Sequence, residues 1–124
     1  MTNNNLILYV EDNRENRLLI RRILEAEGYI VAEAENAAEA LEFVSSQTPD
    51  LILMDINLPN VDGYTLTTQM KDLPDIANVP IIALTANVMK GDRERTLAVG
   101  CDGYIQKPID VDELPKQISI YLKG

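Results

Sequence analysis

Short apolar runs alternate along the chain with longer segments that have helical spacing. The runs lie at Leu6–Val10, Tyr29–Ala32, Leu51–Met54, Pro80–Leu84 and Tyr104–Gln106. Leu6–Val10 and Leu51–Met54 are apolar throughout, which is typical of central strands buried on both faces of a sheet. Because strand and helix alternate about five times, the pattern predicts an α/β domain whose parallel sheet is covered by helices on both faces.

The segments between the runs carry helix signals. A helical stripe that ends at Gly28 is formed by Leu18, Leu19, Arg22, Ile23 and Ala26. Asn36 followed by Glu39 predicts a capping box at the start of a second helix. Asp110 and Glu113 predict another, but Pro115 would then fall a turn inside the helix, where its missing N–H matters. We therefore expect the last helix to start late or with a distorted first turn.

Polar residues follow the apolar runs, at the positions where the predicted strands end. They are Glu11, Asp12, Asp55, Thr85 and Lys107. In open parallel sheets, ligands bind beyond the carboxyl ends of the strands, so these side chains are expected to converge on one edge. Three carboxylates close together would raise the pKa of at least one of them unless a cation is present. Magnesium suits such a site because it takes oxygen ligands from carboxylates and phosphates.

This edge of the sheet predicts phosphoryl chemistry. Asp55 is ionised at neutral pH, so it needs no neighbouring base to attack a phosphoryl group. Lys107 and a magnesium ion would neutralise charge on the transferred group, and Thr85 would donate a hydrogen bond to one of its oxygens.

Composition narrows the classes of function. The 124 residues fit one domain, and a net charge of −9 without a basic patch argues against nucleic-acid binding. The absence of histidine excludes a histidine general base and a histidine-ligated zinc site. The single cysteine, Cys101, cannot form an internal disulfide. Because the sequence also lacks a membrane-spanning run and a signal-peptide pattern, we expect a cytoplasmic protein without a membrane partner.

Four motifs carry a resemblance to a known family. They are VED at Val10–Asp12, MDINLPNVDG at Met54–Gly63, LTA at Leu84–Ala86 and KP at Lys107–Pro108, in this order. Over essentially its whole length the chain resembles the response-regulator receiver domains of two-component signalling. The resemblance implies a flavodoxin-like, doubly wound, five-stranded parallel sheet with strand order 2-1-3-4-5 and helices on both faces. It also implies a single receiver domain over residues 1–124, with no output domain.

The resemblance assigns roles to the residues at the strand ends. Asp55 would be phosphorylated by a sensor histidine kinase or a phosphotransfer protein. Mg²⁺ would be the cofactor, with Asp12 and Asp55 as ligands, Glu11 acting through a water and Asn57 through its backbone carbonyl. Protein partners and a signalling role are thus implied, with no enzymatic activity beyond the domain's own phosphoryl transfer and autodephosphorylation.

The resemblance also implies a switch. Thr85 and Lys107 would bind the phosphoryl group, Tyr104 matches the aromatic that turns inward on activation, and the peptide bond before Pro108 is usually cis in the family. The surface made by Val88–Val99, Tyr104 and the last helix would then bind a downstream protein. We expect the protein to act as a monomer.

Other interpretations fit parts of the pattern. A magnesium-dependent phosphatase with an aspartyl intermediate would also use Asp55, but such enzymes carry a second aspartate where this chain has Asn57. A flavodoxin-like electron carrier would share the sheet, but Glu11 and Asp12 stand where it needs an anion-binding loop. Each of these residues, considered alone, also fits a purely structural role. Asp55 could cap a turn, Thr85 could be an ordinary residue at a strand end, and Tyr104 could serve only in packing.

Overall fold

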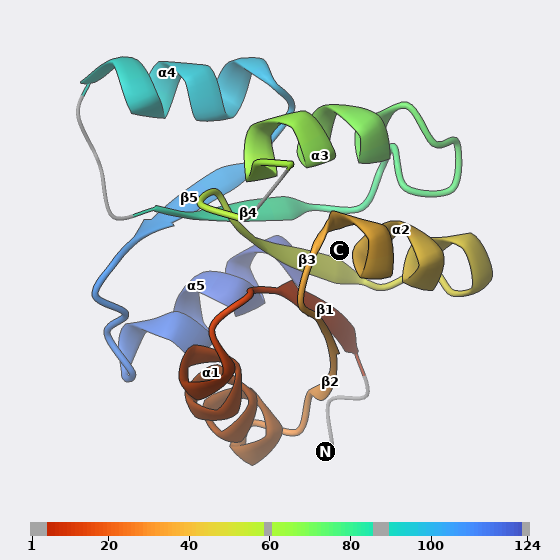
Figure 1. Ribbon diagram of the computed structural model, residues 1–124. Coiled ribbons are helices and arrows are strands. Elements are labelled where there is room, and N and C mark those ends of the chain that lie inside the picture. Colours follow the sequence, from red (N-terminus) through yellow and green to blue (C-terminus); the bar gives the residue numbers. More distant parts are fainter. Residues whose placement is uncertain (1–4, 59–60, 86–89, 123–124) are drawn as a thin grey trace.

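The computed structural model describes residues 5–58, 61–85 and 90–122. A five-stranded sheet contains β1 (Leu6–Val10), β2 (Ile30–Ala34), β3 (Leu51–Asp55), β4 (Ile81–Thr85) and β5 (Gly103–Gln106). All four pairings are parallel and the order is β2-β1-β3-β4-β5 (Figure 1). The predicted fold and strand order are therefore confirmed. The bounds of β1 match the predicted ones, whereas those of the other strands differ by one or two residues. β3 and β4 extend to include Asp55 and Thr85.

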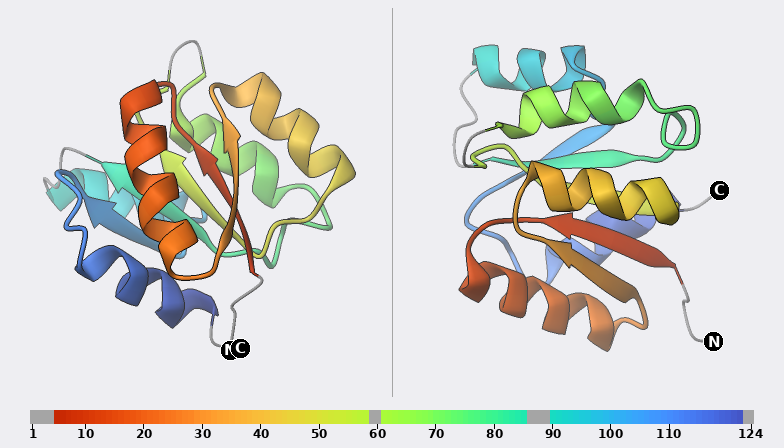
Figure 2. Two further views of the ribbon diagram at one scale, coloured as in Figure 1. Left: turned by 90° about the horizontal axis from the view of Figure 1, so that it is seen from below. Right: turned by 45° about the vertical axis from the view of Figure 1, so that its right-hand side comes forward.

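In the part of the chain that the structure describes, five helices cover the sheet: α1 (Arg14–Ala26), α2 (Ala37–Ser46), α3 (Gly63–Lys71), α4 (Lys90–Ala98) and α5 (Glu113–Leu122). α1 and α5 pack on one face, and α2 and α3 pack on the other, with α4 beside α3 (Figures 1 and 2). In the described part of the chain, no helix has the length and apolar character needed to cross a bilayer.

Alternation along the strands divides the core into two halves. In β3, Leu51 and Leu53 pack on the side of α1 and α5, whereas Ile52 and Met54 pack on the side of α2 and α3. Because successive side chains of a strand point to opposite faces, Asp55 continues the row of Leu51 and Leu53. The alternation therefore directs the Asp55 side chain toward the α1 side of the sheet.

The predicted apolar stripe of α1 is partly wrong. Leu18 and Leu19 are 48% and 47% exposed, whereas Arg17, Ile20 and Leu24 are buried. The helix carries apolar residues on more than one face, so spacing alone does not fix which face packs inward. The buried face carries Ile20 and Leu24 of the core and also Arg17, whose guanidinium contacts backbone carbonyls and carboxylates. Arginine is rarely buried unless it is paired, and its partners here are distant in sequence.

The predicted start of α2 is confirmed, with one shifted bond. The Asn36 side chain accepts a hydrogen bond from the Glu39 N–H at 2.9 Å. The Glu39 carboxylate accepts one from the N–H of Glu35 at 2.7 Å, one residue before the cap. The first bond satisfies an N–H group of the first turn, and the second satisfies the N–H of Glu35 just before the helix, in a variant of the capping box.

The predicted late start of α5 is also confirmed. The Asp110 carboxylate accepts hydrogen bonds from the N–H groups of Asp112 and Glu113, and the helix begins at Glu113. The Leu114 N–H already donates to the carbonyl of Asp110 at 3.0 Å. Pro115 lacks the N–H that would continue this pattern, so the first turn is interrupted before the regular helix.

Candidate functional site

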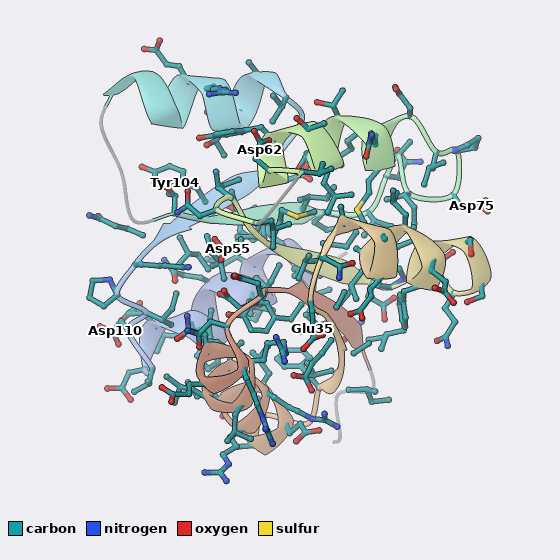
Figure 3. All side chains as sticks on the ribbon, viewed as in Figure 1. Glu35, Asp55, Asp62, Asp75, Tyr104 and Asp110 are labelled. Atoms are coloured by element: carbon teal, nitrogen blue, oxygen red, sulfur yellow. The ribbon has the colours of Figure 1, made fainter. Side chains whose placement is uncertain are left out.

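Three carboxylates meet at the carboxyl edge of the sheet. Glu11 and Asp12 follow β1. Asp55, labelled in Figure 3, is the last residue of the adjacent strand β3. One carboxylate oxygen from each lies within 4.8 Å of the others. Glu11 and Asp55 are only 1% and 2% exposed, whereas Asp12 is open to solvent. The three acids therefore lie together at one edge of the sheet, as expected from the sequence, and two of them are buried while one is accessible.

Lys107 brings a positive charge to this cluster. Its Nζ lies 3.3 Å from Asp55 Oδ2 and 3.5 Å from Glu11 Oε1. The residue follows β5, and its backbone N–H donates to the carbonyl of Thr85 at 2.8 Å. The Lys107–Pro108 peptide bond is cis, the isomer that the resemblance implies. Any group attached to Asp55 Oδ2 would therefore lie close to an ammonium ion.

Asp55 is held at both carboxylate oxygens. The backbone N–H of Asn57 donates to Oδ1 at 3.0 Å, while Oδ2 faces Lys107. Asn57 itself is exposed. Asn57 contacts Asp55 through its backbone N–H, so its amide side chain does not orient the Asp55 carboxylate.

Glu11 accepts a hydrogen bond at each carboxylate oxygen, and its pKa is raised. The Tyr9 hydroxyl donates to Oε1 at 3.0 Å, and the Asn13 N–H donates to Oε2 at 3.3 Å. Burial, and then the neighbouring Asp55, raise the pKa of Glu11 to about 7. Burial likewise raises the pKa of the Tyr9 hydroxyl, which therefore remains a hydrogen-bond donor at neutral pH. The site thus holds more negative charge than Lys107 alone compensates.

Thr85 and Tyr104 lie on adjacent strands and share a face of the sheet. Thr85 ends β4 and is buried, in alternation with Ile81 and Ala83 on the α3 side. Tyr104 pairs in register with Ala83 and packs, partly buried, against the same half of the core. Both side chains therefore face α3 and α4, away from the face that Asp55 continues.

The described part of α4 is joined to α3 through Tyr64. The Arg95 guanidinium lies 4.3 Å from the centre of the Tyr64 ring, and the Thr96 hydroxyl lies 3.3 Å from the Tyr64 hydroxyl. The predicted partner surface begins at Val88, and both Val88 and Met89 lie outside the described residues.

Two residues of the site were missed by sequence reasoning. Arg17 donates to the backbone carbonyls of Glu11 and Asp12, and Tyr9 donates to the Glu11 carboxylate. A tyrosine inside an otherwise aliphatic strand, two residues before an acid, was a usable signal for Tyr9. The signal for Arg17 was weaker, because its partners come from two separate segments, the β1–α1 loop and the end of β2.

Comparison with known proteins places the chain in a family. The response regulator receiver domain matches residues 7–119. The polar-differentiation response regulator DivK of Brucella anthropi is 45% identical over 116 residues, which cover 94% of each chain. DivK of Brucella ovis is 44% identical with the same coverage.

Solved structures that resemble this chain are also receiver domains. The receiver domain of a sensor histidine kinase from Pseudomonas aeruginosa, described with a magnesium ion coordinated in its active-site cleft, is 37% identical with a TM-score of 0.90. The alignment covers 98% of this chain and 100% of that one. The receiver domain of a histidine kinase from Syntrophus aciditrophicus is 36% identical with a TM-score of 0.89, over 97% and 91% of the two chains. The chain therefore belongs to the response regulator receiver domains of two-component signalling.

Proposed function

We propose that this receiver domain is a phosphorylation-dependent switch whose phosphoryl acceptor is Asp55. The observation that carries the proposal is the position of the Asp55 carboxylate. It is buried at the end of β3, clustered with the carboxylates of Glu11 and Asp12, and 3.3 Å from the Lys107 ammonium. The phosphoryl donor would be a sensor histidine kinase or a phosphotransfer protein, as in two-component signalling.

The donor atoms of the cluster fit Mg²⁺. They are all oxygens, which hard cations prefer. Burial, and then the neighbouring Asp55, raise the pKa of Glu11, and a divalent cation would stabilise its ionised form. Asp12 and Asp55 would bind it directly, Asn57 through its carbonyl, and Glu11 through a water. When bound, the ion would neutralise charge on the phosphoryl oxygens. The related kinase receiver from Pseudomonas aeruginosa is described with magnesium in its cleft, which supports the same assignment here.

The residues of the chain itself would carry the transfer. An oxygen of the Asp55 carboxylate attacks the phosphorus and forms an O–P bond. At the same time the bond from phosphorus to the donor's imidazole nitrogen breaks, and its electron pair stays on that nitrogen. Lys107 lies where negative charge develops on the phosphoryl oxygens. Thr85, at the end of the neighbouring strand, would donate its hydroxyl hydrogen to one of them.

The readout would be a changed protein surface. Phosphorylation adds about −1.5 to −2 charges at the edge of the sheet. If the phosphoryl oxygens attract the Thr85 hydroxyl, the space beside Tyr104 would change, because both side chains lie on the α3 side of the sheet. A partner that prefers the phosphorylated form a hundredfold needs about 2.7 kcal/mol of differential binding. The surface proposed for that partner is made by Val88–Val99, Tyr104 and α5.

The two rival functions have weaker support. Asn57 offers no acid–base carboxylate where an aspartyl-phosphate phosphatase would need one, and its contact with Asp55 runs through the backbone. An electron carrier would need an anion-binding loop after β1, and Glu11 and Asp12 occupy that place. We therefore propose no catalysis beyond the domain's own phosphoryl transfer and autodephosphorylation.

Acetyl phosphate provides a direct test. Wild type and Asp55→Asn are incubated with it, with Mg²⁺ or with a chelator, and phosphoryl incorporation is followed by intact mass. We expect one phosphoryl group on wild type only when Mg²⁺ is present, and none on the variant. Incorporation into Asp55→Asn at the wild-type rate would contradict the proposal.

A further inference from the structure

Arg17, in α1, bonds both to the loop after β1 and to the end of β2. Its Nη1 donates to the carbonyl of Glu11 at 2.9 Å and to the carbonyl of Asp12 at 3.1 Å. Its Nε lies 3.2 Å from Glu33 Oε1, in β2, and its Nη2 lies 2.9 Å from Glu35 Oε1, just after β2. The Arg17 side chain is only 9% exposed. One buried guanidinium therefore ties the loop that carries two acids to the end of the neighbouring strand.

These bonds fix the backbone from which Asp12 projects. Two successive carbonyls accept from one nitrogen, so the peptide planes on either side of the Asp12 Cα are both held. Among the described residues, no hydrogen bond or ion pair is formed by the Asp12 carboxylate itself. The direction of this accessible carboxylate is therefore set mainly by its backbone, and the backbone is set by Arg17.

We infer that Arg17 is a positioning residue for the metal site, holding the Glu11–Asp12 loop so that the Asp12 carboxylate faces Asp55. The inference rests on the proposed magnesium site. Groups that orient metal ligands from outside the coordination shell commonly change metal affinity without touching the metal. Glu33 and Glu35 complete the support, because they hold the other two nitrogens of the guanidinium and keep its plane fixed.

Arg21 supplies a matched control on the same helix. Its Nη1 lies 2.6 Å from Glu33 Oε2, and its Nε lies 3.1 Å from Glu25 Oε2, so it also pairs with Glu33. It is 44% exposed, and no contact with Glu11 or Asp12 is found for it in the described part of the chain. A role confined to stabilising α1 would therefore be shared by Arg17 and Arg21, whereas positioning of the acids belongs to Arg17 alone.

The test measures the rate of phosphorylation by acetyl phosphate over a range of Mg²⁺ concentrations for wild type, Arg17→Met, Arg17→Lys and Arg21→Met. The thermal unfolding midpoint of each protein is measured in chelator. We expect both Arg17 variants to raise the half-saturating Mg²⁺ concentration by about tenfold or more, with a maximal rate near that of wild type. Arg21→Met should leave the half-saturating concentration unchanged. Lysine keeps the charge but cannot span both carbonyls and both glutamates, so Arg17→Lys carries the test if Arg17→Met does not fold.

The outcomes separate the two proposals. Lowered unfolding midpoints with unchanged half-saturating Mg²⁺ would overturn the positioning role and leave Arg17 as a structural clamp. The positioning role would also be overturned if Arg17→Lys and Arg21→Met changed the half-saturating Mg²⁺ concentration to the same extent. If wild type is phosphorylated equally well in chelator, the proposed magnesium site itself fails, and the role of Arg17 fails with it.

Discussion

Glu11 and Asp55 are almost inaccessible to solvent, yet each is a carboxylate with fixed hydrogen-bond partners. Isolated buried charges are costly, so such groups persist only where pairing or a bound cation compensates them. Lys107 contacts both acids, at 3.5 Å from Glu11 and 3.3 Å from Asp55. The pKa of Glu11 nevertheless stays raised, to about 7. A cation would therefore compete with a proton at this carboxylate.

This competition predicts pH-dependent magnesium binding. The pKa of Glu11 is raised from 4.5 to about 7, so between these values the folded protein keeps a proton that the unfolded chain loses. Without metal, the contribution of Glu11 to stability is therefore present below pH 4.5 and is lost as the pH rises toward 7. Magnesium needs the ionised form, so its affinity should be about tenfold lower at pH 6 than at pH 8, with a proton released on binding.

Calorimetric titrations in two buffers of different ionisation enthalpy would measure both the affinity and the proton release. Glu11→Gln is the control, and its magnesium affinity should depend much less on pH over the same range. Equal affinities of wild type at pH 6 and pH 8 would show that Glu11 does not compete for the metal.

At the scale of elements, the start of α3 packs closely against the end of β3, where Asp55 lies. The backbone N–H of Gly63 donates to the carbonyl of Ile56 at 2.9 Å, directly after β3. A Cβ atom at Gly63 would lie 2.5 Å from the carbonyl oxygen of Asp55 and 2.7 Å from the Cα of Ile56. Both obstacles are backbone atoms, so neither can move aside without displacing the end of β3. Glycine is needed here for space.

We predict that Gly63→Ala destabilises the fold by about 1–3 kcal/mol and displaces the Asp55 carbonyl. Gly103→Ala is the comparison, because the atoms that its Cβ would meet belong to the side chain of Tyr121, which can turn away. Urea unfolding of wild type and both variants measures the difference. The steric account would be wrong if Gly63→Ala cost no more stability than Gly103→Ala.

The strands and their terminal acids could be predicted because each signal is local. An apolar run ending in Asp55 requires no knowledge of distant residues, and parallel strands bring such ends together automatically. The packed face of α1 could not be predicted in the same way. It is formed by Ile20 and Leu24, which pack into the core, and by Arg17, whose burial requires acceptors in the β1–α1 loop and at the end of β2. These tertiary contacts cannot be seen in the local apolar pattern, which had favoured Leu18 and Leu19.

At the scale of the whole molecule, the site and the proposed readout lie on different faces of one sheet. Asp55 continues the α1 side, while Thr85 and Tyr104 face α3 and α4. α4 is joined to α3 by polar contacts of Arg95 and Thr96 with Tyr64. Such contacts cost little to rearrange compared with a packed apolar core. We therefore expect α4 to move on phosphorylation while the central strands stay fixed.

Amide hydrogen exchange tests this coupling through Thr85. Adding beryllofluoride with Mg²⁺ should alter exchange in Val88–Val99 and Gly103–Lys107 of wild type, and leave the central strands unchanged. Thr85→Ala should still bind beryllofluoride at Asp55 but show much smaller changes in both segments. Equal changes in the two proteins would remove Thr85 from the switch. Unchanged exchange in both would mean that Tyr104 serves only in packing.

The central claim is that Asp55 alone accepts the phosphoryl group. Reduction of the phosphorylated protein with borohydride converts an acyl phosphate on aspartate into homoserine, which peptide sequencing by mass spectrometry then locates. We predict homoserine at position 55, formed only when Mg²⁺ accompanied the phosphoryl donor, and at neither Asp12 nor any other aspartate. Homoserine at another position, or unchanged aspartate at 55 in protein whose intact mass shows phosphorylation, would contradict the account.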